Sequence, residues 1–251
     1  MTLRLQNIFI QGAGRGIGLA FVEELLAKSS GQIYASYRSP QSKNTLQKLQ
    51  NSHGERLHIY YLDVSDEISV RDCADAVAEK TTELSLLINC SGILHGQEMQ
   101  PEKKLEDVNM DFVRKGFAVN TFSVLLMAKH FHRFFHHQNH AIWANISARV
   151  GSIEDNRLGG WYTYRASKAA QNMITKTMAL EFKRIAKTTV CVALHPGTVA
   201  TQLSEPFVSG SRKRTVFSPQ KCVRQLLDVL DKLTLEDSAK FFAWDGSKIP
   251  W

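Results

Sequence analysis

The chain has 251 residues, of which 43% are hydrophobic and 22% charged, and its formal net charge is +7. A chain of this length buries enough apolar surface to fold without disulfides or metals, and its composition excludes a disordered or fibrous protein. The four cysteines are scattered with no CxxC pair, which is typical of reduced thiols in the cytoplasm.

Neither a membrane segment nor a nucleic-acid-binding surface is visible in the sequence. No apolar stretch approaches the ~20 residues that span a bilayer, and Met1 to Gln11 lacks the pattern of a signal peptide. Basic residues are spread along the whole chain, and the densest patch, Arg212-Lys213-Arg214, holds only three charges. We therefore expect a cytoplasmic protein that binds neither membrane nor nucleic acid.

Apolar runs alternate with longer amphipathic stretches throughout the chain. The predicted strands are Asn7–Gln11, Gln32–Ser36, Leu57–Leu62, Leu84–Asn89, Ala141–Ser147 and Thr188–Leu194. The predicted helices are Gly16–Lys28, Pro40–Asn51, Asp66–Thr82, Asn109–His137, Gly160–Ala186 and one that begins near Ser218. This alternation predicts an α/β fold, a Rossmann-type doubly wound parallel sheet with helices on both faces. We expect a single domain over residues 1–251, with residues 199–217 as a substrate-binding flap.

The first predicted strand is followed at once by a glycine-rich turn, residues 12–18 (GAGRGIG), and then by a helix. Glycines let backbone N–H groups approach a pyrophosphate closely, and the helix N-terminus adds unpaired donors. This placement predicts a dinucleotide site at Gly12, Gly16 and Gly18.

The end of the second predicted strand indicates which dinucleotide is bound. Sites that prefer NAD carry an acidic residue about 20 positions after the glycines, and no Asp or Glu occurs between Gly31 and Gly54. Arg38 follows this strand instead, and Arg15 lies within the glycine turn. Two guanidinium groups suit the 2′-phosphate of NADP(H), which we therefore expect as the cofactor.

Tyr164 and Lys168 are four residues apart at the start of a long predicted helix, so they share one helical face. A nearby cation lowers the pKa of a phenol and fits it for acid–base work. The Ser147 hydroxyl, at the end of the preceding strand, could stabilise negative charge on a carbonyl oxygen. Asn120 is a poor helix former within an apolar helix, which indicates that its amide is buried and hydrogen-bonded.

These elements together resemble the short-chain dehydrogenase/reductase family over nearly the whole chain. The resemblance rests on the glycine turn, Asp63-Val64, residues 89–92 (NCSG), Asn120, Ser147, Tyr164, Lys168 and residues 195–201 (HPGTVAT). Residues 145–153 (NISARVGSI), with Trp244-Asp245-Gly246 and Pro250-Trp251, are similar to the C-factor and Sniffer-like carbonyl reductases. Three positions differ from the usual pattern: Gln11 replaces threonine, Cys90-Ser91 replaces Asn-Ala, and Gly14 stands where a side chain often binds phosphate.

The resemblance implies a role for each matching residue. Tyr164 would protonate the carbonyl oxygen, Lys168 would lower the tyrosine pKa and bind the nicotinamide ribose, and Ser147 would orient the carbonyl. Asn120 would complete a proton relay through water, and Asp63 would contact the adenine. The implied cofactor-binding set is Gly12, Arg15, Gly16, Ile17, Gly18, Arg38, Asp63, Val64, Asn89, Ser91, Gly92, Tyr164, Lys168, Pro196, Gly197, Val199 and Thr201.

The resulting hypothesis is an NADP-dependent enzyme that reduces a small aldehyde or ketone. Leu203, Pro206, Phe207 and Val208 in the predicted flap favour an apolar carbonyl substrate. The family resemblance implies a homodimer or homotetramer built on the helices Asn109–His137 and Gly160–Ala186.

Three alternatives remain open at this stage. One is a cell–cell signalling protein of the C-factor kind, which uses the same nucleotide fold. Another is a basic nucleic-acid-binding module, for which the interleaved aromatic residues are missing. The third is a metal site at His130, His132, His136, His137 and His140, although no HExxH motif accompanies these histidines, and a solvated helix end is the expected reading.

Overall fold

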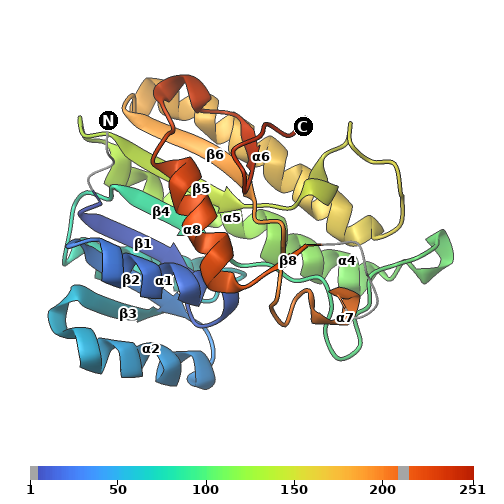
Figure 1. Ribbon diagram of the computed structural model, residues 1–251, viewed down its shortest axis with the longest axis horizontal. Helices are drawn as coiled ribbons and strands as arrows, with labels where there is room; N and C mark the ends of the chain where they lie inside the picture. The colour runs from blue at the N-terminus through green and yellow to red at the C-terminus, as the bar shows by residue number, and fades with distance from the viewer. Residues whose placement is uncertain (1–4, 209–214) are drawn as a thin grey trace.

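A seven-stranded parallel sheet forms the centre of the computed structural model, which describes residues 5–208 and 215–251 (Figure 1). Across the sheet the strands follow the order β3 (Leu57–Tyr61), β2 (Gln32–Tyr37), β1 (Asn7–Gln11), β4 (Leu86–Asn89), β5 (Ala141–Ile146), β6 (Thr189–His195) and β9 (Phe241–Ala243). Every neighbouring pair is parallel. The order reverses between β1 and β4, and such a switch point is where open α/β sheets bind ligands.

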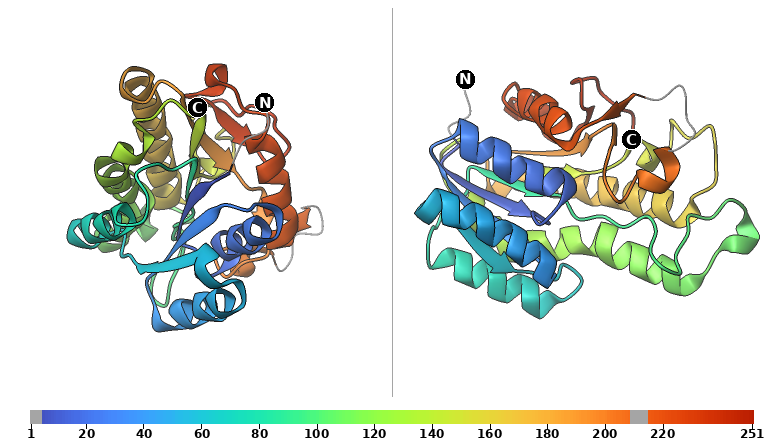
Figure 2. Two further views of the ribbon diagram at one scale, coloured as in Figure 1. Left: turned by 90° about the vertical axis from the view of Figure 1, so that its left-hand side faces the viewer. Right: turned by 60° about the horizontal axis from the view of Figure 1, so that its bottom comes forward.

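Helices cover both faces of the sheet (Figure 2). One face carries α1 (Gly16–Lys28), α2 (Pro40–His53) and α8 (Pro219–Leu230), and the other carries α3 (Glu67–Ala78), α5 (Ser123–Phe131) and α6 (Tyr162–Ile185). The helix α4 (Met110–Phe117) leads into α5, and α7 (Glu205–Val208) follows β6. The fold class predicted from the sequence, a Rossmann-type doubly wound sheet, is confirmed.

Successive side chains along each strand point to opposite faces of the sheet, which explains why both faces are covered by helices. In β1, Ile8 and Ile10 pack in the core beneath α1 and α8, whereas Phe9 packs in the core beneath α3 and α5. In β5, Ile142 and Ala144 face the first core and Trp143 faces the second. Successive strand side chains point to opposite faces, so an uninterrupted apolar strand requires a helical layer on each side.

The structure corrects several predicted elements. The predicted helix Asn109–His137 is divided into α4, a π-helical turn at Ala118–Phe122 and α5, and it ends in a 3₁₀ turn at His132–Phe135. The strand β9 was not predicted, because only three residues carry it.

The predicted flap, residues 199–217, is not irregular throughout. It contains α7 and the second strand of a small parallel pair, β7 (Thr198–Val199) with β8 (Val216–Phe217). Arg212-Lys213-Arg214 and the rest of residues 209–214 lie outside the described residues. In the described part of the chain, no helix is long and apolar enough to cross a bilayer.

Candidate active site

The glycine turn between β1 and α1 has the backbone that a phosphate-binding loop requires. Gly12 and Gly16 adopt φ values of +74° and +56°, which favour glycine. A Cβ at Gly18 would lie 2.2 Å from the backbone oxygen of Gly12, so this position also excludes a side chain. Among the described residues, no side chain caps the N-terminus of α1, and its first turn contains no acidic residue. This arrangement fits the pyrophosphate of a dinucleotide.

Two departures from the family pattern have local structural reasons. Gly14 lies against the first turn of α2, where a Cβ would come within 2.2 Å of Ser42 Cβ. Gln11 is 3% exposed, and its Nε2 and Oε1 atoms contact the hydroxyl and the backbone N–H of Ser91. Gln11 and Ser91 therefore form a matched pair that joins the end of β1 to the loop after β4.

Arg38 and Asp63 follow β2 and β3, at the carboxyl ends of the strands where the sequence predicts a nucleotide. Burial opposes ionisation of Asp63, but hydrogen bonds from Ser65 and the charge of Arg38 keep the pKa of this carboxyl below its ordinary value. Arg38 is exposed, so its guanidinium is accessible to a ligand. Arg15, in contrast, contacts Gln202 Oε1 on the segment after β7.

Asn89 is the last residue of β4, and its side chain is buried. Its Nδ2 atom donates to Asn145 Oδ1 at 2.6 Å, which joins the ends of β4 and β5. Within the described residues, Asn89 Oδ1 is buried and accepts no hydrogen bond. Val64, which follows Asp63, is 4% exposed and packs in the core beneath α3, so only its backbone is available to a ligand.

Lys168 lies on α6 with only 2% of its surface exposed. Its Nζ atom donates to the backbone oxygen of Ile146 at 3.0 Å and to Gln171 Oε1 at 2.7 Å. Burial lowers the pKa of Lys168 to about 7, although the neighbouring Cys90 acts in the opposite direction. Gly151 allows this close packing, because a Cβ there would lie 2.7 Å from Lys168 Cβ.

Tyr164 precedes Lys168 by one helical turn and is 8% exposed. Burial raises the pKa of its phenol, so the group is held in its protonated form, whereas the sequence predicted a pKa lowered by Lys168. The start of α6 is fixed by Glu102, whose carboxylate accepts from the backbone N–H of Thr163 at 3.2 Å and from its hydroxyl. The backbone oxygen of Glu102 also accepts from the N–H of Trp161 at 2.6 Å. These contacts hold the backbone immediately before Tyr164 in place.

Ser147 follows β5 and is 3% exposed. Its Oγ atom donates to Asn172 Oδ1 at 2.6 Å, and Asn172 Nδ2 donates to the backbone oxygen of Gly151 at 3.3 Å. The Ser147 hydrogen must therefore turn away from Asn172 before this hydroxyl can donate to another oxygen.

Asn120 lies in the π-helical turn between α4 and α5, where its amide is 1% exposed. It exchanges two hydrogen bonds with the backbone of Ile93 and donates to Ser167 Oγ at 3.0 Å. The expectation that its amide is buried and hydrogen-bonded is thereby met. A Cβ built on Gly92 would lie 3.6 Å from Asn120 Oδ1 and 3.8 Å from Lys168 Nζ, so these three predicted residues converge.

A cavity of about 180 Å³ opens beside Ser147 and Tyr164. Its walls include Trp161 and Phe207, whose ring centroids are 5.0 Å apart, and the predicted flap residue Leu203. Pro206 is exposed and lies outside the lining. The predicted cofactor residues that line this cavity are Ile17, Pro196, Gly197, Val199 and Thr201.

His195, at the end of β6, also lines the cavity. Its Nδ1 atom accepts from the backbone N–H of Arg149 at 3.2 Å, which leaves the hydrogen on Nε2. Burial, reinforced by the charge of Arg149, lowers the pKa of His195 to about 4. The ring is therefore a neutral hydrogen-bond donor at physiological pH.

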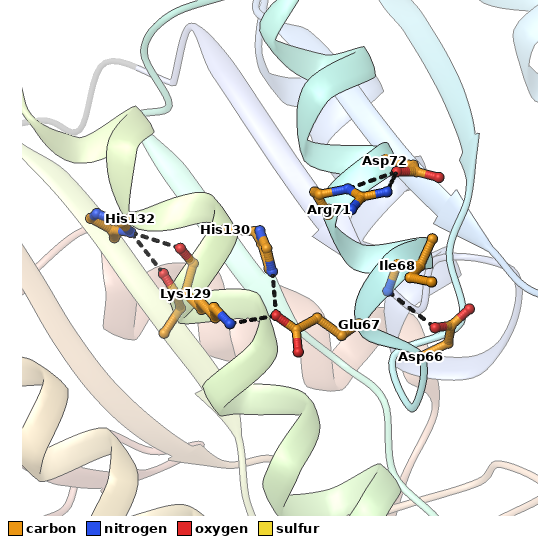
Figure 3. Close-up of polar contacts among 9 residues, drawn as sticks. Asp66, Glu67, Ile68, Arg71, Asp72, Lys129, His130 and His132 are labelled. Carbon is orange, nitrogen blue, oxygen red and sulfur yellow. Dashed lines mark hydrogen bonds and ion pairs between the residues drawn. The ribbon is translucent and has the colours of Figure 1, made fainter.

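His130 and His132, near the end of α5, contact different partners (Figure 3). His130 Nε2 lies 3.2 Å from Glu67 Oε1 at the start of α3, and Lys129 contacts the same carboxylate. His132 instead contacts backbone oxygens of its own helix. Within residues 5–208 and 215–251, no group of three or more His, Cys, Asp or Glu side chains could hold a metal ion.

Sequence reasoning missed Gln171, Asn172, Glu102 and the hydrogen-bonding role of His195. Gln171 and Asn172 carried a usable signal, because they lie three and four residues after Lys168 on the buried face of α6. Glu102 carried none, since its contact with Thr163 joins residues 61 positions apart.

Because Lys168 is buried, its ammonium form is less stable in the folded protein than in the unfolded chain. We therefore expect the stability of the protein to depend on pH. Between pH 7 and the ordinary lysine pKa of 10.5, the unfolded chain binds a proton that the folded protein lacks. The free energy of unfolding therefore rises with pH across this window. Lys168→Met removes the group that titrates. The free energy of unfolding of this variant should therefore exceed that of wild type most near pH 7, and the difference should shrink toward pH 10.5.

Urea unfolding across that window measures the difference. Lys183→Met, at an exposed position of the same helix, is the matched control and should follow wild type at every pH. If the free energies of unfolding of wild type and Lys168→Met changed with pH in the same way, Lys168 would have an ordinary pKa in the folded protein.

Comparison with known proteins identifies the family. The sequence pattern of the short chain dehydrogenases matches residues 6–211. The chain is similar to NADPH-bound carbonyl reductase from chicken fatty liver, with a TM-score of 0.88 and 32% identity over 99% of this chain and 95% of that one. Carbonyl reductase Sniffer of D. melanogaster gives a TM-score of 0.86 and 25% identity over 98% and 100% of the two chains.

A third relative is the C-signal protein of Myxococcus xanthus. It is 38% identical over 108 residues, which cover 43% of this chain and 60% of the relative. The family match spans far more of the chain, including the glycine turn, the ends of β4 and β5, and the start of α6. The protein therefore belongs to the short-chain dehydrogenase family, and it is an oxidoreductase whose fold is that of the carbonyl reductases.

Proposed function

We propose that this protein is an NADPH-dependent carbonyl reductase that acts on apolar aldehydes or ketones. The observation that carries the proposal is that Tyr164 and Ser147 line one cavity, with the buried Lys168 one helical turn after Tyr164. Several residues of the predicted cofactor-binding set line the same cavity. The similarity to an NADPH-bound carbonyl reductase supports the same reaction class.

Arg38 and the glycine turn would hold the dinucleotide. The open N-terminus of α1 suits the pyrophosphate, and the exposed Arg38 suits the 2′-phosphate that distinguishes NADPH from NADH. Asp63, kept ionised beside Arg38, would accept a hydrogen bond from the adenine amino group. Asn89, Ser91 and Gly92 would line the adenosine ribose. When bound, NADPH would supply a hydride from its nicotinamide ring.

Tyr164 would act as the general acid. Burial keeps its phenol protonated, so a proton is available for the carbonyl oxygen as negative charge develops there. A protonated Lys168 on the same helical face would stabilise the phenolate that remains. Ser147 would turn its hydrogen from Asn172 to the same carbonyl oxygen and share the developing charge. Asn120 Oδ1 and Lys168 Nζ both lie beside Gly92, and Asn120 would support a water that returns the proton.

The cavity walls favour an apolar substrate. Leu94, Val150, Leu203 and the ring pair Trp161 and Phe207 supply its apolar lining. Polar side chains, among them Ser147 and His195, lie beside these apolar walls, which suits a compound with one reactive carbonyl and an apolar body.

The 2′-phosphate assignment predicts a selective effect of Arg38→Ala. Removal of a charge-assisted contact worth about 1.5–3 kcal/mol should weaken NADPH binding by roughly 10- to 100-fold. NADH binding should change little, because its ribose lacks that phosphate. Fluorescence titration of the purified protein with both nucleotides measures the two dissociation constants.

Arg71→Ala is the control, since this exposed arginine pairs with Asp72 on α3. An equal loss of NADPH and NADH affinity in Arg38→Ala would contradict the phosphate assignment.

A carbonyl panel tests the reaction itself. NADPH oxidation should be observed with apolar compounds such as octanal and benzaldehyde, and should be much slower with the small charged ketone pyruvate. The reverse preference would overturn the substrate assignment. Turnover of no carbonyl compound, together with no binding of either nucleotide, would overturn the enzyme assignment.

The second candidate function is signalling between cells, supported by the similarity to the C-signal protein. It predicts biological activity that is independent of NADPH and survives substitution of Tyr164. A cell-based response that Tyr164→Phe abolishes would instead show that any signal is a product of the reductase.

A further inference from the structure

Gln171 touches the Lys168 ammonium group, yet it belongs to none of the motifs that define the site. We propose that Gln171 is a positioning residue that holds Lys168 at the end of β5 and favours its charged form. The inference rests on the proposed function, because it concerns the lysine assigned to the reduction of a carbonyl compound.

Both polar atoms of the Gln171 amide are hydrogen-bonded, one to Lys168 and the other to the backbone of Ile146. Gln171 Oε1 accepts from Lys168 Nζ at 2.7 Å, while Gln171 Nε2 donates to the backbone oxygen of Ile146 at 3.3 Å. Lys168 Nζ donates to the same Ile146 oxygen at 3.0 Å. The two side chains therefore share one acceptor at the carboxyl end of β5. The amide orientation of Gln171 is fixed, because a reversed amide would direct its NH₂ group at the ammonium.

Burial gives this contact its effect on charge. Gln171 is 1% exposed and Lys168 is 2% exposed, so neither group has free access to water. An ammonium in such surroundings depends on protein oxygens for its stability, and each acceptor that is removed lowers its pKa further. Gln171 supplies one of the two acceptors that the structure gives Lys168.

The other groups that face Lys168 do not replace Gln171. The Tyr164 phenol, one turn earlier on the same face of α6, is held neutral by burial. Cys90, which follows β4, is half-buried, and desolvation raises the pKa of its thiol. Neither is a charged partner near neutral pH, so Gln171 is left as the side-chain acceptor for the ammonium.

A wider hydrogen-bond network anchors Gln171 itself. Thr175 donates through Oγ1 to the backbone oxygen of Gln171 at 2.8 Å and accepts from Asn145 Nδ2 at 2.9 Å. Asn145 in turn accepts from Asn89 at the end of β4. The position of Lys168 is thus tied to the ends of β4 and β5 through buried polar groups.

The test compares Gln171→Met, which removes the acceptor at similar volume, with Gln171→Glu, which adds a negative charge. The direct readout is NMR titration of Lys168 in cofactor-free protein that carries ¹³C at lysine Cε, with Lys168→Met used to assign the signal. Loss of one hydrogen bond to a charged group should lower the Lys168 pKa by about 1–2 units in Gln171→Met. Gln171→Glu should raise the Lys168 pKa, because an ion pair favours the ammonium.

The kinetic readout is the pH dependence of kcat with octanal. In Gln171→Met the loss of activity on the alkaline side should move to lower pH, while KM for octanal stays the same. Gln220→Met, at an exposed position of α8, should match wild type in both readouts.

Unchanged Lys168 pKa values in both variants would overturn the proposal. If Gln171→Met fails to fold, as judged by circular dichroism, the shift in Gln171→Glu decides alone. An NMR shift in a protein that reduces no carbonyl would uphold the contact and reject the proposed function.

Discussion

A lysine ammonium group buried to 2% exposure is the constraint on which the site depends. Its two acceptors, the Ile146 oxygen and Gln171, fix where α6 crosses the end of β5. Gly151 is required at this crossing, because any side chain there would meet Lys168. Once the lysine is placed, Tyr164 one turn earlier and Ser147 at the strand end face the same cavity.

The ends of β1, β4 and β5, which carry several of the predicted cofactor-binding residues, are joined by buried polar contacts rather than by loops alone. Gln11 holds Ser91, and Asn89 holds Asn145, so the ends of β1, β4 and β5 form one continuous frame. The frame explains how this chain accommodates its departures from the family pattern. The Gln11–Ser91 pair is itself part of this frame, and Gly14 makes room for Ser42 of α2.

Features set by local sequence could be predicted, and features set by tertiary packing could not. The uninterrupted apolar runs of β1 and β5, and the glycines before α1, are local signals that led directly to the doubly wound fold. The break at Asn120 was hidden because a π-helical turn keeps the helical pattern of apolar residues on both sides. The strand β9 has three residues, too few for a periodic signal.

The same division applies within the site. Tyr164, Lys168 and Ser147 could be proposed from their spacing, whereas the bond from Ser147 to Asn172 depends on how α6 packs against β5. The cap that Glu102 places on α6 comes from a distant loop and leaves no trace in the spacing of residues. The neutral state of His195 follows from burial and from the backbone of Arg149, neither of which the sequence reveals.

Direct transfer of hydride at this centre is the claim that most needs measurement. Octanal would be incubated with NADPH deuterated at the transferable nicotinamide position, and the alcohol product analysed by mass spectrometry. The account predicts one deuterium on the carbinol carbon with wild-type protein, and no deuterated alcohol with Tyr164→Phe, although this variant still binds NADPH. Deuterated alcohol formed equally well by Tyr164→Phe would contradict it, because proton donation would then not depend on the buried tyrosine.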